Sequence, residues 1–240
     1  MAMAIITGAT SGIGRATAVE MASRGFDLHL SARHRPALSE IKCKIDKRFE
    51  SVEVRTCQID LAQPRAGALL IEHALECFSG VDVLINNAGF AQQVPIGKCD
   101  HYSIGLAFQV NAIAPAEAIN AVWPVMCENG GGRIINVSTL GTRDPFTGFF
   151  AYAASKCAVN SFVRSIALEG RAVGIKGFAV AFGAVETPLL RSLFDETVIP
   201  TSSTLSAEEA ASVIVECACG ARDEENGETI WMMKESALDC

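Results

Sequence analysis

Short apolar runs alternate along the chain with longer stretches in which apolar positions recur every three or four residues. The first pattern is typical of buried strands and the second of amphipathic helices. The runs predict strands at residues 3–7, 26–32, 52–59, 81–86, 133–138, 175–182 and 228–233. The recurring pattern predicts helices from the first glycine-rich segment to Arg24, and at about 36–49, 64–78, 101–127, 152–170 and 206–218.

Strands that alternate with helices in this way form a parallel sheet with helices on both faces. We therefore predict an α/β fold, a doubly wound, mainly parallel sheet of seven strands. No repeat, low-complexity tract or linker divides the sequence, so residues 1–240 are expected to form a single domain. Ligands bind outside the carboxyl ends of such strands, which predicts a substrate pocket near segments 90–98, 139–150 and 183–205.

Composition narrows the classes of function. With 240 residues, of which 50% are hydrophobic, the chain is large enough to bury a sizeable core. A net charge of −7 argues against nucleic-acid and anionic-membrane partners. No apolar stretch is long enough to span a bilayer and only Met1 and Ala2 precede the first strand, so a cytoplasmic protein is expected. The nine cysteines lack metal-ligand spacing and indicate a reducing compartment, with no metal site.

A glycine-rich turn lies between the first strand and the first helix. It reads G-A-T-S-G-I-G, from Gly8 to Gly14. Glycines let the backbone turn tightly and approach a pyrophosphate, whose charge then faces the free N–H groups at the helix N-terminus. The turn predicts a Rossmann-type dinucleotide site.

Tyr152 and Lys156 stand four residues apart in the segment A-Y-A-A-S-K. On a helix, residues at this spacing share one face. A nearby ammonium favours the ionised phenol and lowers its pKa, which would suit Tyr152 to exchange a proton with an alcohol or carbonyl oxygen. An isolated pair of this kind is more often a solvated surface pair, so its meaning depends on the other motifs.

Several motifs occur in a fixed order over nearly the whole chain: T-G-A-T-S-G-I-G at 7–14, Asp60, N-N-A-G at 86–89, Asn111, G-R-I-I-N-V-S-T at 132–139 and Y-A-A-S-K at 152–156. Together they resemble the short-chain dehydrogenase/reductase family. The resemblance implies that Tyr152 exchanges a proton with the substrate oxygen. Lys156 would lower the pKa of Tyr152 and hold the nicotinamide ribose.

The resemblance implies further roles. Asn111 would hold a water that relays protons through Lys156, or it is a helix-bending polar residue satisfied by backbone. Asn86 is expected to tie adjacent strands. The implied coenzyme contacts are Gly8, Thr10, Ser11, Gly12, Ile13, Gly14, Asp60, Leu61, Asn87, Ala88, Gly89, Tyr152, Lys156, Gly183, Val185 and Thr187.

Two positions depart from the family pattern. The family places a serine thirteen residues before the tyrosine, where this chain has Thr139, with Ser138 one residue earlier. Adjacent strand residues face opposite sides, so only one hydroxyl reaches the substrate, and the spacing favours Thr139. After the sixth strand, Phe182 replaces the family's proline. It either forms a wall beside the nicotinamide or simply ends a buried strand.

Coenzyme preference is decided at the end of the second strand, where a carboxylate binds a ribose 2′-hydroxyl and a basic residue accommodates a 2′-phosphate. Ala32 takes the acidic position and is followed by Arg33, His34 and Arg35. A guanidinium binds phosphate through two parallel hydrogen bonds, so the sequence favours NADP over NAD, with Arg33 as the phosphate ligand. Ser11 is not the second basic residue that many NADP-dependent members carry.

The pattern predicts an NADP-preferring oxidoreductase that transfers hydride between nicotinamide and a carbonyl compound or secondary alcohol. The alternatives are an NAD-dependent alcohol dehydrogenase and a catalytically idle nucleotide-binding sensor or scaffold. By family analogy the protein is a homo-oligomer, a dimer or tetramer, built from helices 101–127 and 152–170. Candidate substrate contacts are Phe90, Gln92, Arg143, Phe146, Phe149, Phe150, Leu190, Leu193 and Phe194.

Overall fold

A computed structural model describes residues 2–234 and contains one sheet of seven strands in the order β3-β2-β1-β4-β5-β6-β7. Every neighbouring pair is parallel. The predicted α/β fold is confirmed. The strands are β1 (Met3–Thr7), β2 (Asp27–Ala32), β3 (Val54–Gln58), β4 (Val83–Asn86), β5 (Gly132–Thr139), β6 (Ile175–Phe182) and β7 (Thr229–Met232).

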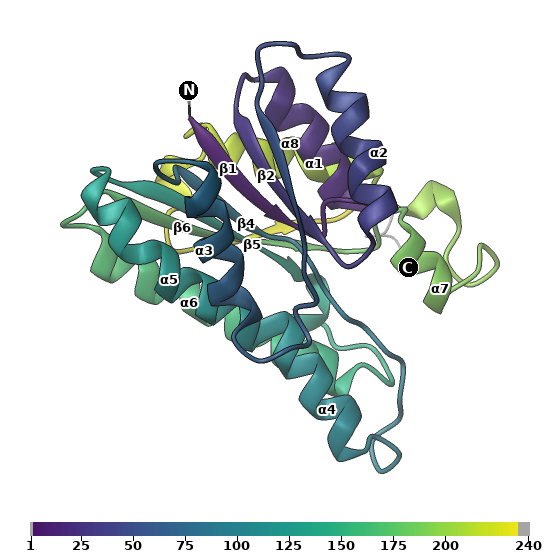
Figure 1. Cartoon of the computed structure of the whole chain (residues 1–240). Coiled ribbons are helices and arrows are strands. Elements are labelled where there is room, and N and C mark those ends of the chain that lie inside the picture. The colour runs from purple at the N-terminus through teal and green to yellow at the C-terminus, as the bar shows by residue number, and fades with distance from the viewer. Residues whose placement is uncertain (1, 235–240) are drawn as a thin grey trace.

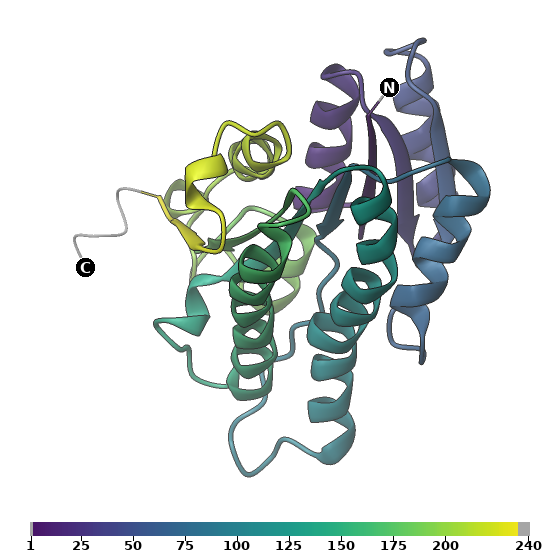
Figure 2. The same cartoon turned by 90° about the vertical axis from the view of Figure 1, so that its left-hand side faces the viewer.

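Helices cover both faces of the sheet (Figure 1). One layer consists of α1 (Gly12–Ser23), α2 (Arg35–Asp46) and α8 (Ala207–Ala218). The opposite layer consists of α3 (Ala66–Cys77), α5 (Ala114–Glu128) and α6 (Phe150–Gly170). The long helical segment that ends in α5 runs beside α6, as Figures 1 and 2 show from two directions.

The two layers of helices pack on two separate apolar clusters, because successive strand side chains point to opposite faces. In β1, Ala4 and Ile6 pack with the α1, α2 and α8 layer, whereas Ile5 packs with the α3, α5 and α6 layer. All five residues of β1 are buried. The order of strands reverses between β1 and β4, and this point of the carboxyl edge is where such folds bind ligands.

Several elements differ from the sequence-based expectations, among them three short 3-10 helices at 140–142, 201–203 and 223–225. The predicted helix at 101–127 is continuous, but it consists of α4 (His101–Phe108), a π-helical turn (Gln109–Ile113) and α5. Single π turns often mark functional sites, and this one contains Asn111. A short helix, α7 (Pro188–Leu193), forms within the predicted substrate segment 183–205, where the sequence pattern predicted none.

The start of α8 follows its local sequence signal. Ser206 accepts a hydrogen bond from the Glu209 N–H at 3.0 Å, and Glu209 Oε2 accepts one from the Ser206 N–H at 2.7 Å. This reciprocal capping box begins α8, where the sequence predicted a helix start. No helix among residues 2–234 is long and apolar enough to cross a membrane.

Candidate active site

The glycine turn connects β1 to α1 at the carboxyl edge of the sheet. Gly8 and Gly12 both adopt positive φ, +65° and +48°, which glycine adopts with little strain. A Cβ on Gly14 would lie 2.3 Å from the Gly8 carbonyl oxygen and 2.4 Å from Asn87 Nδ2. The turn is therefore packed so closely that three of its positions require glycine for conformation or space.

Side chains from β1 and the segment after β4 hold this turn in place. The Thr7 hydroxyl accepts hydrogen bonds from the backbone N–H groups of Asn87 at 3.0 Å and Ala88 at 2.9 Å. Asn87 Nδ2 donates to the carbonyl oxygens of Thr7 at 2.8 Å and Gly8 at 3.3 Å. Two of the predicted coenzyme segments, 8–14 and 87–89, are thus one rigid unit. Thr7 was not among the predicted site residues, although it opens the T-G-A-T-S-G-I-G motif.

The turn has the properties that a dinucleotide pyrophosphate needs. Ser11 is the N-cap of α1, and its side chain makes no capping hydrogen bond, so the N–H groups of the first helical turn have no side-chain acceptor. A Cβ on Gly12 would lie 2.8 Å from Thr187 Cγ2. Thr187, predicted to contact the nicotinamide end, therefore lies against the glycine turn. These residues fit a nicotinamide dinucleotide, with its phosphates on the α1 N-terminus.

The region that would receive the adenosine end lies at β2 and β3. Arg33 follows β2 and its side chain is exposed, while its carbonyl oxygen accepts a hydrogen bond from Gln58 Nε2 at 3.1 Å. Among residues 2–234, no ion pair engages the Arg33 guanidinium. The Asp60 carboxylate accepts a hydrogen bond from the Ala62 N–H at 3.1 Å and so fixes the turn after β3, beside buried Leu61.

Thr139 and Ser138 are both buried at the end of β5, but only Thr139 meets Tyr152. The Thr139 hydroxyl is close enough to the Tyr152 phenol to favour its ionised form and so to lower its pKa. Thr139 Oγ1 also accepts a hydrogen bond from the Gly141 N–H at 3.2 Å. The Ser138 hydroxyl has no hydrogen-bond partner within the described chain. The structure thus brings together the pair that the spacing favoured.

The phenol of Tyr152 titrates differently from the sequence-based expectation. Desolvation raises the pKa of Tyr152 to about 12, and the neighbouring Thr139 hydroxyl opposes this rise only in part. Lys156 was expected to lower the pKa of Tyr152. In this arrangement desolvation dominates, and the ammonium is not among the causes of the shift.

Lys156 is anchored on the neighbouring strand. Its Nζ donates a hydrogen bond of 2.7 Å to the carbonyl oxygen of Val137 in β5. Burial lowers the pKa of the Lys156 ammonium to about 8. A Cβ on Gly89 would lie 3.7 Å from Lys156 Nζ and 3.5 Å from Asn111 Oδ1. The absence of a side chain at Gly89 therefore leaves space directly beside the ammonium.

Asn111 is fully buried in the π turn, and its amide is engaged on both sides. Its Oδ1 accepts from the Phe90 N–H at 2.8 Å, and its Nδ2 donates to the Phe90 carbonyl oxygen at 2.8 Å and to Ser155 Oγ at 3.0 Å. Ser155 Oγ in turn donates to the Tyr152 carbonyl oxygen at 2.7 Å. Sequence reasoning missed Ser155, although it belongs to the Y-A-A-S-K motif.

The remaining predicted residues occupy their expected segments. Asn86 Nδ2 donates to Asn136 Oδ1 at 2.9 Å and ties β4 to β5. Phe182 is buried in the apolar cluster beneath α1 and α8, as expected of the end of a buried strand. The Gly183 N–H donates to the Met232 carbonyl oxygen, and Val185 forms an isolated parallel bridge with Leu205. Residues 183–205 therefore form an ordered segment above the sheet edge.

The residues at this edge combine a closely packed glycine turn with half-buried Tyr152 and the buried side chains of Thr139 and Lys156. A family model described as short chain dehydrogenase matches residues 2–197. The chain belongs to the short-chain dehydrogenase/reductase family. Like other members of this family, it is an oxidoreductase that acts on small molecules.

Individual members of the short-chain dehydrogenase/reductase family share the fold with this chain but carry different names. Sulfoacetaldehyde reductase 2 of Chromohalobacter salexigens is 31% identical over 218 residues, covering 88% of this chain and 85% of the relative. The crystal structure of levodione reductase superposes with a TM-score of 0.91 at 24% identity, covering 100% of this chain and 98% of that one, and so shows the shared fold.

A third similar protein bears on the coenzyme. The structure of a protein described as an NAD(P)-dependent gluconate 5-dehydrogenase of Beutenbergia cavernae, with NADP bound at low occupancy, has a TM-score of 0.87 and 27% identity. The match covers 96% of this chain and 94% of that one. The names of these three proteins refer to different compounds, so family membership establishes oxidoreductase chemistry without the substrate.

Proposed function

We propose that the protein is an NADP-preferring carbonyl reductase or secondary-alcohol dehydrogenase with Tyr152 as its proton donor and acceptor. The observation that carries the proposal is the convergence of three groups: Tyr152 and the buried Lys156 lie one turn apart on α6, and the buried Thr139 hydroxyl at the end of β5 acts on the Tyr152 phenol. When bound, the nicotinamide supplies a hydride to the carbonyl carbon, or accepts one from the alcohol carbon. Tyr152 donates the proton to the substrate oxygen in the first direction and takes it back in the second.

The other polar residues have distinct parts in this proposal. In this proposal the Thr139 hydroxyl, which favours the ionised form of the phenol, assists Tyr152 in exchanging its proton with the substrate oxygen. Lys156, held by Val137, faces the space beside Gly89 where a ribose would lie. Asn111 is a positioning residue in this proposal, because its amide is occupied by Phe90 and Ser155 rather than free to bind a relay water.

The proposal is tested by following NADPH oxidation with a panel of aldehydes and ketones. General acid–base catalysis contributes about 10²–10⁴-fold, so Tyr152→Phe should lower kcat by at least about 100-fold. Coenzyme affinity, measured by calorimetry, should change little. Tyr102→Phe is the matched control, because Tyr102 is the chain's other tyrosine and is 74% exposed. Normal coenzyme binding with no turnover above that of Tyr152→Phe would favour the sensor or scaffold alternative.

NADP preference rests on Arg33, whose guanidinium is exposed beside the end of β2. A hydrogen bond to a charged group contributes about 1.5–3 kcal/mol, so Arg33→Ala should weaken NADPH binding by about tenfold or more. Binding of NADH should stay unchanged, because it lacks the 2′-phosphate, and it serves as the internal control. Equal effects on the two coenzymes would instead support the NAD-dependent alcohol dehydrogenase.

A homo-oligomer and a cytoplasmic location remain predictions. Large apolar side chains are exposed on the helices expected at the interface, namely Tyr102, Ile113 and Leu168. Burial of these side chains against a second copy would favour association, because it removes apolar surface from water. Light scattering at working concentration should give the mass of a dimer or tetramer, and a monomeric mass would contradict the oligomer.

A further inference from the structure

An aromatic cluster lies directly beside the catalytic hydroxyls. It consists of Phe146 and Phe149 from the segment before α6 and Phe194 from the segment after α7. The Phe149 ring lies edge-on to Tyr152, with centroids 6.0 Å apart, and stacks on Phe194 at 5.8 Å and 29°. It also meets the edge of Phe146 at 6.4 Å. Phe149 is only 5% exposed, so it forms the inner part of the cluster.

The cluster also borders Thr139. A Cβ on Gly141 would lie 3.3 Å from the Phe146 ring and 3.5 Å from Thr139 Oγ1, which places this ring and the hydroxyl on either side of one position. The third predicted substrate segment is attached as well, because the Val94 N–H donates to the Gly148 carbonyl oxygen at 2.7 Å. The three segments therefore meet around an aromatic surface next to the proton donor.

The cations of the same three segments are engaged elsewhere. Arg191 donates to Glu186 and, at 2.8 Å, to the Ile199 carbonyl oxygen. Arg143 pairs with Asp144 at 3.1 Å, and its guanidinium lies over the Trp231 ring at 5.2 Å. Each guanidinium thus already has a partner of its own.

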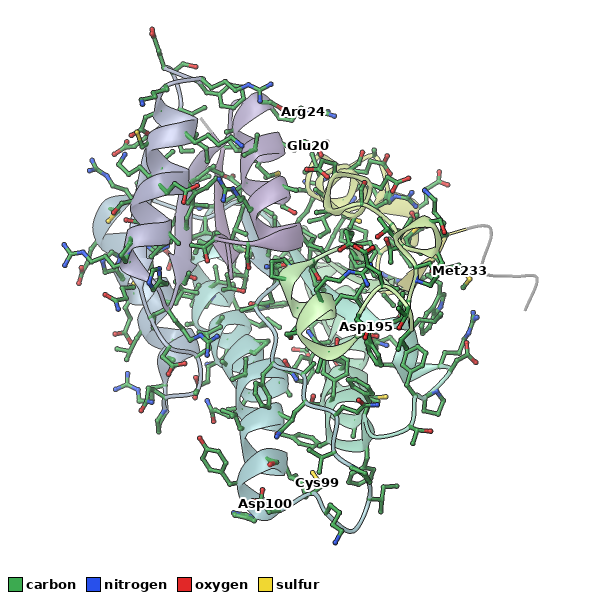
Figure 3. The ribbon with its side chains drawn as sticks, turned by 90° about the vertical axis from the view of Figure 1, so that its right-hand side faces the viewer. Glu20, Arg24, Cys99, Asp100, Asp195 and Met233 are labelled. Atoms are coloured by element: carbon green, nitrogen blue, oxygen red, sulfur yellow. The ribbon has the colours of Figure 1, made fainter. Side chains whose placement is uncertain are left out.

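Lys98 is the third basic residue of these segments, after Arg143 and Arg191. Lys98 directly precedes Cys99 and Asp100, which Figure 3 shows at the start of α4, at the end of the molecule opposite Glu20 and Arg24. The three segments carry four acidic residues against these three basic ones: Asp144, Glu186, Asp195 and Glu196. Both guanidinium groups of the substrate segments are therefore already paired, and these segments carry a slight excess of negative charge.

We propose that the substrate is an uncharged carbonyl compound with an aromatic or similarly apolar group that packs on the Phe149–Phe194 pair. This inference rests on the proposed carbonyl-reductase function. A carboxylate or sulfonate held against these rings would lose water without gaining a partner, which is costly. Offset and edge-on ring contacts, in contrast, stabilise an aromatic ligand beyond the burial of its area.

Two matched pairs of ketones test the proposal. Methyl 4-acetylbenzoate and 4-acetylbenzoate differ only in the charge of a group distant from the ketone, and methyl levulinate and levulinate are the aliphatic counterpart. The ester should have the higher kcat/KM in each pair, by about tenfold or more, because the anion is desolvated without a cation. The aromatic ester should also be preferred over the aliphatic one.

Substitutions of Phe194 test whether these substrate preferences arise at the aromatic cluster. Phe194→Leu should reduce the preference for the aromatic ester, and Phe194→Arg should reverse the preference for charge. Phe49→Leu is the matched control, since Phe49 packs on the other face of the sheet. Ligand-observed NMR with the coenzyme-free protein provides a second measurement that needs no turnover. The aromatic ester should receive saturation from the protein more strongly than the acid does.

The outcomes separate the two proposals. Equal or better turnover and binding of the acids, or an unchanged charge preference in Phe194→Arg, would overturn the substrate class while the carbonyl-reductase function stood. Absence of turnover of any carbonyl compound with either coenzyme would contradict the proposed function. In that case, preferential NMR binding of the aromatic ester would still support the binding surface, and its absence would overturn it.

Discussion

The coenzyme side and the substrate side of the site are built in different ways. On the coenzyme side, the glycine turn is held by main-chain groups and by Thr7 and Asn87, at distances that leave no room for a side chain at Gly14. On the substrate side, aromatic rings from distant segments meet, and the outermost ring, Phe146, is 52% exposed. The shape of the coenzyme side is determined by the path of the backbone. The shape of the substrate side is determined by the side chains that two loops carry.

This difference explains why the sequence predicts the type of reaction more readily than the substrate. A backbone turn that needs glycine at fixed positions accepts few alternatives, whereas rings on loops are exchanged without disturbing the sheet. The relatives of this chain accordingly share the fold while their names refer to different compounds. The predictions below test the contrast between the two sides, beginning with the largest effect.

Gly14→Ala should break the coenzyme side. The new Cβ would overlap the Gly8 carbonyl oxygen at 2.3 Å and Asn87 Nδ2 at 2.4 Å, and the backbone atom cannot move without distorting the turn. Overpacking of this kind costs about 1–3 kcal/mol and sometimes more, and we expect a loss of about 3 kcal/mol or more in the free energy of unfolding. NADPH binding measured by calorimetry should be abolished.

Gly105→Ala is the matched control for this substitution. Gly105 lies in α4, and a Cβ there meets no atom within 4 Å. Alanine stabilises a helix by up to about 1 kcal/mol relative to glycine, so this variant should be slightly more stable and bind coenzyme normally. Similar losses in both variants would mean that the close contact at Gly14 is not the cause.

The two sides also differ in how they should respond to pH. The substrate segments carry their charges at the surface, whereas His29 in β2, beneath the coenzyme side, is completely buried. His29 Nε2 shares a hydrogen bond of 2.9 Å with His73 Nδ1 of α3. Burial, aided by the neighbouring His73, lowers the pKa of His29 from 6.5 to about 4.

The sign of the effect follows from proton binding. Between pH 6.5 and 4 the unfolded chain binds a proton at His29 that the folded protein does not, so stability is complete above pH 6.5 and is lost as the pH falls towards 4. This shift corresponds to at most about 3 kcal/mol. Urea unfolding at several pH values should show the loss, and His29→Leu should flatten it. His34→Leu, which changes an exposed histidine, should leave the slope intact; a slope that persists in His29→Leu would contradict the assignment.

The sequence predicted most of the fold because the strands and long helices depend on local patterns. All seven strands and the six predicted helices form near their expected positions, and Ser206 begins α8. The π turn and α7 escaped prediction, as did three short 3-10 helices at 140–142, 201–203 and 223–225. The π turn at 109–113 keeps the apolar spacing of an ordinary helix, and α7 is too short to show a period. The π turn and α7 depend on tertiary contacts, such as the two hydrogen bonds between the Asn111 amide and the backbone of Phe90.

Motif spacing predicted which residues share one edge of the sheet but not the environment of their side chains. Tyr152, Lys156 and the glycine turn all lie at the carboxyl edge, and their roles there stay predictions. The direction of the pKa shift of Tyr152 was wrong, because it depends on desolvation, which no local spacing reports. The contact between Phe149 and Phe194 could not be predicted from local spacing either, because it joins two segments that are far apart in the sequence.

Thr139 and Ser138, at the end of β5, lie where the coenzyme side and the substrate side meet. Substitutions of these two residues test which hydroxyl assists Tyr152. The two residues pair with Phe182 and Ala181 in β6 and face opposite sides of the sheet. Thr139→Val keeps the shape of the side chain but removes its hydroxyl. Loss of a donor to the oxygen that gains charge in the transition state lowers kcat by about 100-fold or more, and we expect the lower end of that range if Thr139 assists at the substrate oxygen. Thr139→Ser should retain most of the activity, because it keeps the hydroxyl.

Ser138→Ala is the counterpart and should have the smallest effect. The Ser138 hydroxyl is buried without a hydrogen-bond partner among the described residues, so its removal leaves no group newly unsatisfied. Stability should stay the same or rise slightly, and kcat should change less than about threefold, or about 0.6 kcal/mol. A larger loss of activity in Ser138→Ala than in Thr139→Val would assign the assisting hydroxyl to Ser138. It would also mean that the end of β5 rearranges when substrate and coenzyme bind.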